Sequence, residues 1–270
     1  MYTAPFRYFR AVSVAEADSL FAKTADAKYI AGGQTLIPTM KQRLAAPAAL
    51  IDLSRIAELS FIRHDKGPLM IGAGTRHADV AASSHASTLI PALAVLASLI
   101  GDPAVRHKGT LGGSVANNDP AADYPAAVVA LDATVKTTRR SIGADAFFTG
   151  LFQTALADGE LITELAFPIP LRAGYVKFPN PASRYALVGV FVAQFSDAVR
   201  VAVTGAAPCV FRVPEMEQAL SRSFTVDSVA DVAVKPDGLN ADLFASADYR
   251  AHLVTVMAKR AVAAALGKHL

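Results

Sequence analysis

Apolar residues recur in patterns that divide the beginning of the chain into alternating helices and strands. Ser13 and Glu16 form an S-x-x-E capping box, and the apolar residues after them recur at helical spacing, which predicts a helix. Short apolar runs at 28–30 and 49–53 predict two strands, with a helix-like pattern at 36–44 between them. The order helix, strand, glycine-rich turn, helix, strand is typical of an α/β unit.

A second region with a mixed pattern begins near residue 56. Strands are expected at 60–63 and 69–71, on either side of a polar turn, and a helix is expected from Arg76 with Thr75 as its N-cap. Two apolar helices and then two strands complete this region, at 91–99, 121–131, 133–138 and 160–167.

The composition shifts at Pro168-Ile169-Pro170, which is the best position for a domain boundary. Beyond it, apolar or alternating runs predict three strands of one meander, at 174–178, 186–194 and 199–204. The pattern then becomes helical and ends in an amphipathic helix at 249–266. We therefore predict two domains, 1–170 and 171–270, and divide the first into subdomains of about 1–56 and 57–170.

Composition and charge narrow the class of protein. Apolar residues make up 53% and charged residues 18% of the 270 positions, which is typical of a packed globular protein whose core needs no disulfide. The 26 basic and 23 acidic residues sum to +3, and no basic cluster extends beyond Arg139-Arg140, so nucleic acid is not an expected partner. The longest apolar run, 90–101, is too short for a transmembrane segment, and no secretory signal precedes it.

The single cysteine, Cys209, restricts the chemistry further. It excludes an intrachain disulfide, a cysteine-rich zinc site and an iron–sulfur cluster held by this chain alone, and it fits a reducing, cytoplasmic setting. The histidines show no H-x-H or H-E-x-x-H spacing, so no metal site is expected in this chain.

Two glycine-rich loops, residues 31–35 and 109–114, each lie between expected elements. Paired glycines accept positive φ and expose the backbone, so successive N–H groups can converge on an anion. Two such loops suit a diphosphate, which carries charge on two centres. For either loop alone, a tight turn that requires glycine is the alternative interpretation.

Other candidate motifs are weaker. No Lys-Ser/Thr follows either loop, which excludes a Walker A motif, and His77 occupies the third glycine position of a G-x-G-x-x-G pattern, which argues against a Rossmann site. Asp119 and Asp123 are spaced to share one helical face, but Asp119 could equally be an N-cap with Pro120 at the first helical position. We find no self-sufficient catalytic residue.

Six ordered blocks together resemble the FAD-binding medium subunit of molybdenum hydroxylases, the family that includes carbon monoxide dehydrogenase and xanthine dehydrogenase. The blocks cover nearly the whole chain: 31–36, 71–75, 106–117, 119–123, 160–164 and 182–186. The resemblance implies an α+β fold with a bilobed FAD-binding domain of the PCMH/vanillyl-alcohol-oxidase type. A C-terminal domain with a three-stranded antiparallel sheet and helices would follow it.

The resemblance also implies the FAD-binding residues. In both loops, backbone N–H groups would hold the diphosphate, and Asp123 would bond toward the ribose or ribityl region. Leu161 or Ile162 would pack near the flavin or adenine. Tyr185 resembles an aromatic that lies near the isoalloxazine in some members, although an ordinary strand aromatic is equally compatible. The expected contacts are Ala31, Gly32, Gly33, Gln34, Thr35, Leu36, Thr110, Leu111, Gly112, Gly113, Ser114, Asn117, Asp123, Leu161, Ile162 and Tyr185.

One position departs from the family pattern, because Gln34 stands where relatives often have His, Asn or Ser. An amide can still donate to a phosphate or flavin oxygen. Neither loop contains a histidine suited to covalent flavin attachment, so the FAD is expected to be noncovalent.

The implied function is electron transfer within a heterotrimer or a dimer of heterotrimers. A large molybdopterin-binding subunit would oxidise the substrate, a small [2Fe-2S] subunit would pass the electrons on, and FAD in this chain would deliver them to an external acceptor. One alternative is a stand-alone flavin oxidoreductase similar to UDP-N-acetylenolpyruvoylglucosamine reductase. Another is a non-catalytic protein that binds a different nucleotide diphosphate.

Overall fold

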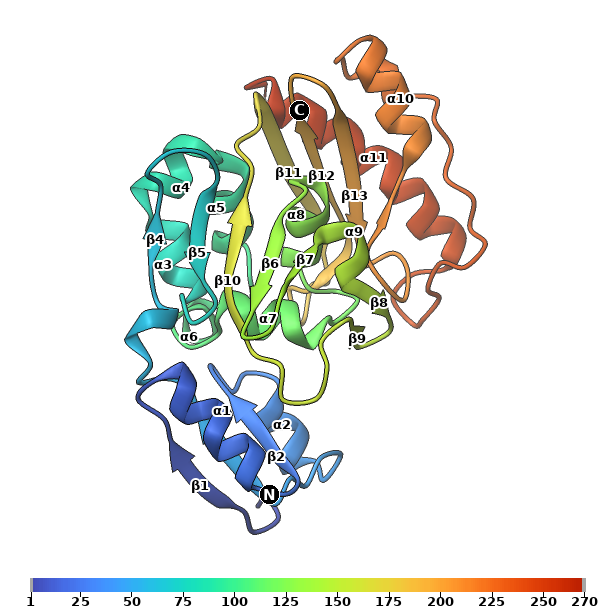
Figure 1. Ribbon diagram of the computed structural model, residues 1–270. Helices are drawn as coiled ribbons and strands as arrows, with labels where there is room; N and C mark the ends of the chain where they lie inside the picture. The colour runs from blue at the N-terminus through green and yellow to red at the C-terminus, as the bar shows by residue number, and fades with distance from the viewer. Residues whose placement is uncertain (1, 269–270) are drawn as a thin grey trace.

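The computed structural model describes residues 2–268, and its mixture of helices and strands confirms the expected α+β class. The N-terminal part, blue in Figure 1, contains an all-parallel sheet of order β1-β3-β2 and two helices. Its elements are β1 (Arg7–Arg10), α1 (Val14–Lys23), β2 (Ala27–Ile30), α2 (Leu36–Lys41) and β3 (Ala49–Asp52).

The start of α1 is capped as its sequence predicts. The Ser13 hydroxyl accepts from the Glu16 N–H at 3.2 Å, and the Glu16 carboxylate accepts from the Val12 N–H at 2.8 Å. The preceding strand β1 was not predicted, because its residues are largely exposed and carry no apolar alternation.

The middle of the chain forms a five-stranded antiparallel sheet of order β4-β5-β10-β6-β7, with a two-stranded hairpin beside it. The strands and a short 3₁₀ turn are η1 (Ala57–Leu59), β4 (Ile62–Arg63), β5 (Leu69–Gly72), β6 (Thr134–Thr137), β7 (Ser141–Gly143), β8 (Phe148–Gly150), β9 (Gln153–Thr154) and β10 (Ile162–Phe167). The helices are α3 (His77–Ala82), α4 (Ser84–Leu89), α5 (Pro91–Ser98), α6 (Pro103–Arg106), α7 (Leu111–Asn117), α8 (Tyr124–Ala130) and α9 (Ala144–Phe147).

The predicted N-cap Thr75 was wrong. The residue before α3 is Arg76, and the Thr75 hydroxyl instead donates to the Phe61 carbonyl at 3.0 Å and accepts from the Phe61 N–H at 3.2 Å. A bond partner distant in the chain has replaced the local cap that the sequence suggested.

The C-terminal part contains an antiparallel sheet of order β11-β12-β13-β14, with one short strand more than the expected three. Its elements are β11 (Arg172–Pro179), β12 (Ala186–Gln194), β13 (Val199–Thr204), β14 (Phe211–Arg212), α10 (Pro214–Arg222), η2 (Asp227–Val229) and α11 (Ala247–Ala265). The long helix α11 lies against this sheet so closely that a Cβ on Gly174 would be 2.0 Å from the Ala261 carbonyl oxygen. None of the helices within residues 2–268 has both the length and the apolar character needed to cross a membrane.

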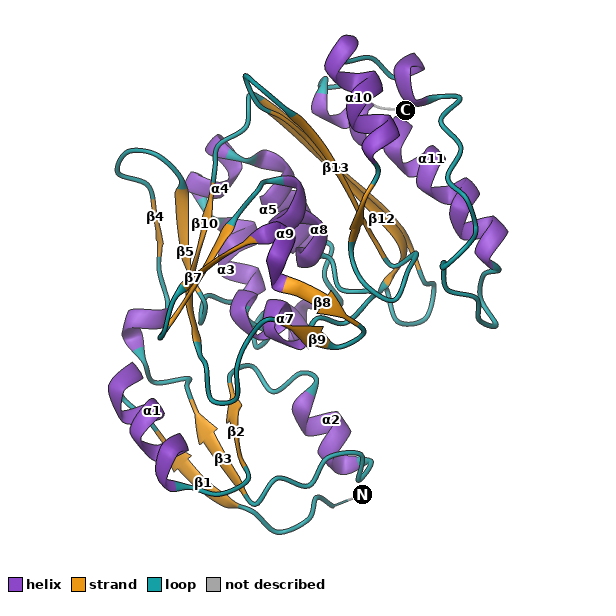
Figure 2. Cartoon of the chain, turned by 45° about the vertical axis from the view of Figure 1, so that its right-hand side comes forward, coloured by secondary structure: helices purple, strands orange, loops and turns teal. Residues whose placement is uncertain are grey.

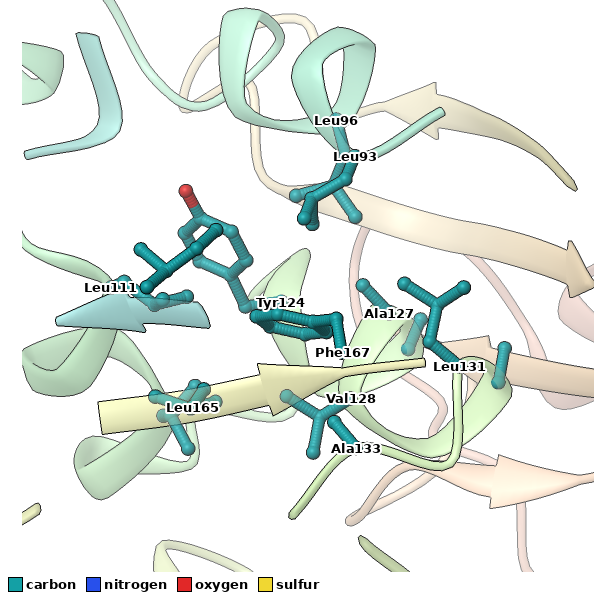
Figure 3. Close-up of a cluster of buried hydrophobic side chains, with 14 of the residues drawn as sticks. Leu93, Leu96, Leu111, Tyr124, Ala127, Val128, Leu131, Ala133, Leu165 and Phe167 are labelled. Carbon is teal, nitrogen blue, oxygen red and sulfur yellow. The ribbon is translucent and has the colours of Figure 1, made fainter. Parts of the chain in front are cut away.

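The core continues from the middle of the chain into the C-terminal sheet. Helix α8 lies between the five-stranded sheet and strands β12 and β13 (Figure 2). The largest cluster of buried side chains includes Tyr124, Leu165 and Phe167 and extends to Phe191 on β12 (Figure 3 shows the part around α8). The alternate residues of β12, such as Val190, belong to a second cluster with α11. Strand β12 is therefore apolar along its length because both of its faces are covered.

Candidate functional site

The two glycine-rich loops meet at Gly32. A Cβ at this position would lie 2.1 Å from the Lys108 carbonyl oxygen and 2.7 Å from the Gly109 Cα. Both distances are far inside van der Waals contact, and both atoms belong to backbone. Glycine is thus required here so that the loop after β2 can touch the loop before α7.

The first loop leaves its backbone donors free. Among residues 2–268, no protein acceptor is found for the N–H groups of Gly32, Gly33, Gln34 and Thr35. Gly33 has φ +69°, a value that favours glycine, and Thr35 precedes α2 without a side-chain capping bond. Consecutive free N–H groups around a left-handed residue form the type of concavity that binds anions.

Most backbone N–H groups of the second loop already have acceptors within the protein. The Leu111 N–H donates to the Thr75 carbonyl and the Gly112 N–H to the Ala73 carbonyl, at 2.9 and 2.8 Å. The Gly113 N–H donates to the Thr110 hydroxyl, and the Ser114 N–H to the Thr110 carbonyl. These four donors already have protein acceptors in this structure, so the free backbone donors belong to the first loop. That N–H groups of both loops hold a diphosphate stays a prediction.

A cavity of about 460 Å³ lies along both loops. Most of the expected contacts line it: Ala31, Gly32, Gly33, Gln34, Thr35, Leu36, Thr110, Gly113, Ser114, Asn117, Asp123 and Tyr185. The polar lining is provided mainly by backbone, hydroxyl and amide groups, with a few charged side chains. Segments from the end of β2 and the loop after it, from α7 and from the loop before β12 thus line one cavity.

Four expected contacts lie elsewhere. Leu111 is fully buried in the main core, and a Cβ on Gly112 would lie 2.5 Å from the Ala73 Cβ, so both residues face the interior. Leu161 and Ile162, at the start of β10, are 8% and 3% exposed and also belong to hydrophobic clusters. Neither of these two residues, which were expected to contact FAD, lines the cavity.

Several lining residues were not anticipated. Sequence reasoning missed Ile30, Thr39, His77, Ile100, Gly101, Val105, Gly109, Asp119, Ala122, Ser183 and Arg184. Five of them lie inside the blocks that carry the resemblance but were not named as contacts: Gly109, Asp119, Ala122, Ser183 and Arg184. Asp119 had been considered as a cap. The wall formed by Ile100, Gly101 and Val105 carries no polar motif, so nothing in its sequence pointed to a ligand.

His77 contacts the second loop at Gly109. Its backbone N–H donates to the Gly109 carbonyl at 3.0 Å, and a Cβ on Gly109 would lie 2.6 Å from its Nε2. Burial, with a smaller effect from Arg106, lowers the pKa of His77 to about 4, so the imidazole is neutral near pH 7. Within the described residues, neither its Nδ1 nor the hydroxyl of the adjacent Tyr124 has a hydrogen-bond partner.

The two aspartates differ in their local roles. Asp119 is not a helix cap: its carboxylate accepts from the Ala121 N–H at 2.9 Å in a turn, and α8 begins only after Asp123. Burial raises the pKa of Asp119. Asp123 is 4% exposed, lines the cavity and pairs with Lys177 at 3.0 Å.

Tyr185 lies in the loop before β12 and is 45% exposed while its side chain borders the cavity. Burial raises the pKa of its hydroxyl, and the nearby Asp119 and Asp123 add to this effect, so the group remains a donor at neutral pH. Its neighbour Arg184 lines the same cavity with a φ of +62°. Tyr185 therefore lies just before β12 and lines the cavity, and its position near a flavin stays a prediction.

The residues present fit an extended dinucleotide. The free N–H groups between Gly32 and Thr35 suit a diphosphate, and Asp123 offers a carboxylate to a hydroxyl. The exposed ring of Tyr185 suits the flat face of an aromatic ring system. In residues 2–268 there is no group of three or more His, Cys, Asp and Glu side chains with the geometry of a metal site.

Comparisons with known proteins agree with this fit. Residues 4–170 match the family described as the FAD binding domain in molybdopterin dehydrogenase. The chain is 35% identical to the carbon monoxide dehydrogenase medium chain of Hydrogenophaga pseudoflava over 96% of each chain. It is 33% identical to the nicotine 6-hydroxylase medium subunit of Paenarthrobacter nicotinovorans over 95% of each.

Solved structures give the same result for the fold. The carbon monoxide dehydrogenase from Hydrogenophaga pseudoflava, in a form that lacks the Mo-pyranopterin moiety, superimposes with a TM-score of 0.88 at 34% identity over 100% of both chains. Quinoline 2-oxidoreductase from Pseudomonas putida 86 superimposes with a TM-score of 0.89 at 27% identity over 99% of both. The chain therefore belongs to the family of FAD-binding domains in molybdopterin dehydrogenases, and it is an FAD-dependent oxidoreductase subunit of the molybdenum hydroxylase type.

Proposed function

We propose that this chain is the electron-transfer subunit of a cytoplasmic molybdenum hydroxylase complex and holds noncovalent FAD in the cavity between its loops. Residues 1–170 would form the bilobed, PCMH-type FAD-binding domain, with subdomains of about 1–56 and 57–170. Residues 171–270 would form the C-terminal flavoprotein domain. The observation that carries the proposal is that the N–H groups of Gly32–Thr35 have no acceptor within residues 2–268 and belong to residues that line the cavity.

The chain's own residues would divide the work of binding. Backbone N–H groups of the first loop would hold the diphosphate, and the second loop would provide a fixed wall with the Ser114 hydroxyl and the Asn117 amide. Asp123 would accept from a ribityl or ribose hydroxyl, and Tyr185 would lie against the ring system. When bound, FAD supplies the ability to accept and release electrons, and the protein positions it.

Other subunits would supply the metal centres. The curated relatives are named medium chains or medium subunits, a name that implies larger and smaller companions. With one cysteine, this chain has no ligand set for an iron–sulfur cluster. We therefore propose a small [2Fe-2S] subunit as electron donor and a large molybdopterin-binding subunit, in a heterotrimer or a dimer of heterotrimers.

The test is reconstitution of the purified full-length chain with FAD. We expect stoichiometric flavin absorbance after removal of free ligand and weaker binding of ADP in competition, because ADP lacks the isoalloxazine. Absence of flavin binding would contradict the proposal. Equal affinity for FAD and ADP would instead support a nucleotide-diphosphate-binding protein, and reduction of a small substrate by the isolated chain would support a stand-alone flavin oxidoreductase.

A further inference from the structure

Lys177 on β11 is a buried lysine with three polar contacts. Only 4% of its side chain is exposed, and its Nζ lies 3.0 Å from Asp123 Oδ1 and 3.1 Å from Oδ2. The same Nζ donates to the Leu99 carbonyl at 2.9 Å. Lysine is almost never buried without a partner, and here the Asp123 carboxylate and the Leu99 carbonyl are the partners.

These contacts join three segments around the cavity. Leu99 caps the end of α5 and is followed by Ile100 and Gly101, which line the cavity, and Asp123 lines it from the start of α8. Lys177 belongs to the C-terminal sheet and is not part of the lining. One ammonium group outside the cavity therefore fixes two parts of its wall.

The charge state of Asp123 depends on the same contacts. The pKa of Asp123 is raised overall, because the effect of burial exceeds the opposing effects of the Lys177 ammonium and of the Tyr175 hydroxyl, which donates to Asp123 Oδ1. Burial keeps the pKa of Tyr175 well above its usual value, so this hydroxyl remains a donor. A carboxylate has about four acceptor positions, so Asp123 can bond both partners and still accept from a ligand hydroxyl.

We propose that Lys177 is a positioning residue for FAD: it holds the Asp123 carboxylate in place at the cavity wall, so that the carboxylate can accept from a hydroxyl of the bound cofactor. This inference deepens the proposed function and rests on it. A buried ion pair is often no more stabilising than a packed apolar pair. Because Asp123 lines the cavity, the pair can contribute to ligand binding even where it adds little to stability.

The other titratable groups around Asp123 do not replace Lys177. They come from β11, from α8 and from the loop before β12, and they are Tyr175, Tyr124 and Tyr185. The pKa of each of these tyrosines is raised, partly by Asp123, so none becomes charged near neutral pH. Asp119 and His77 also line the cavity and are the groups to distinguish from Asp123 in a titration.

The experiment measures FAD affinity of the full-length chain between about pH 6 and about pH 8 for four variants. The variants are Lys177→Met, Lys177→Arg, Asp123→Asn and the double variant with Asp123→Asn and Lys177→Met. We expect Lys177→Met to bind FAD more weakly than the wild type, by about tenfold at the low end of this pH range, and to recover as the pH rises, because loss of the ammonium raises the pKa of Asp123 further. Lys177→Arg retains the charge and should show no such pH dependence, as should the double variant, which lacks the titrating carboxyl.

Three results would overturn the inference. The first is wild-type affinity of Lys177→Met at every pH, and the second is a pH dependence that persists in the double variant, which would assign the titration to Asp119 or His77. The third is unfolding of both Lys177→Met and the double variant, because Lys177 would then act through packing. If only Lys177→Met unfolds, the unpaired carboxyl is the cause and the pairing role is supported.

A negative result here is distinguishable from failure of the proposed function. If the wild-type chain binds no FAD, the proposed function fails together with this inference. If the wild type binds FAD and the Lys177→Met curve is identical to it, only the role of Lys177 is wrong.

Discussion

The two glycine-rich loops look alike in sequence but are built differently. The first loop, between β2 and α2, leaves the N–H groups from Gly32 to Thr35 without protein acceptors in the described part of the chain. In the second loop, the N–H groups donate to the carbonyls of Ala73 and Thr75 and to the hydroxyl and carbonyl of Thr110. The glycines of the first loop therefore belong to a row of free donors, and Gly32 also allows close contact with the second loop. In the second loop, Gly112 allows close packing against Ala73.

This difference suggests that the first loop binds the ligand and that the second loop holds the first in place. The first loop is suited to hold an anion, but it has few internal bonds to fix its shape. The second loop is held by Ala73, Thr75 and the buried His77, and at Gly32 it makes close contact with the first. Variants that act on one loop alone should therefore change affinity and stability in different proportions.

The largest effect is expected where the loops touch. A Cβ in Gly32→Ala would lie 2.1 Å from the Lys108 carbonyl oxygen, and backbone atoms cannot rotate away. The loops must separate, so we expect FAD affinity to fall by about a hundredfold or more, as for other losses of binding geometry. Titration of the purified chain with FAD, followed by flavin fluorescence, measures this.

The matched control is Gly143→Ala. Gly143 has φ −70°, and an added Cβ would have no neighbour within 4 Å. Its FAD affinity should equal that of the wild type. Normal affinity in Gly32→Ala would mean that contact between the loops is not needed for binding.

The second prediction concerns His77, which supports only the second loop. Its folded pKa of about 4 is below the unfolded value of about 6.5, so only the unfolded chain takes up this proton as the pH falls between them. Stability should therefore fall by about 3 kcal/mol from pH 6.5 to pH 4 on account of this residue. Urea unfolding of wild type and His77→Gln at several pH values measures the difference.

In His77→Gln this component of the pH dependence should disappear. His85→Gln, which changes an exposed histidine, should retain it. If His77→Gln loses stability with falling pH as steeply as the wild type, His77 is not the responsible group.

Much of the fold could be predicted because the controlling interactions are local or periodic. The bounds predicted for β12 and β13 agree with the structure, since both strands are mostly apolar and buried on both faces, with Arg200 as the one charged residue among them. Strand β1 could not be predicted, because it is short and largely exposed and its position comes from pairing with β3. The Thr75 hydroxyl could not be predicted for the same reason, because it donates to the Phe61 carbonyl, 14 residues earlier in the chain, and does not cap α3.

The candidate site was predictable where glycines and polar groups occur together. Both loops, Asp123 and Tyr185 line one cavity, as the resemblance implied. The apolar wall around Ile100 could not be anticipated, because an apolar residue at a helix end looks the same whether it faces a core or a ligand. The contribution of Lys177 arises from β11 and α8, which meet only in the folded chain.

The third prediction compares a glycine from each loop. A Cβ in Gly112→Ala would lie 2.5 Å from the Ala73 Cβ and 2.8 Å from the Ala73 carbonyl oxygen. Overpacking of this kind should lower the free energy of unfolding by about 2 kcal/mol. In Gly33→Ala the near atom is the movable Ile37 Cδ1 at 2.7 Å, so the main cost is the φ of +69°, about 1 kcal/mol.

The two variants should also differ in FAD binding. Gly33→Ala should weaken binding by more than its loss of stability accounts for, because its N–H lies in the row of free donors. Gly112→Ala should mainly lower the thermal midpoint. Equal ratios of affinity loss to stability loss in both variants would remove the distinction between the loops.

The smallest effect compares the two threonines that precede the loop helices. The Thr110 hydroxyl accepts from the Gly113 N–H at 3.2 Å, whereas Thr35 makes no side-chain capping bond to α2. Thr110→Val should therefore lower the free energy of unfolding by about 1 kcal/mol, the usual value of an N-cap, and Thr35→Val by less than about 0.5 kcal/mol. Denaturant unfolding of the FAD-free chains resolves the pair, and an equal loss in both would show that the second loop does not depend on its cap.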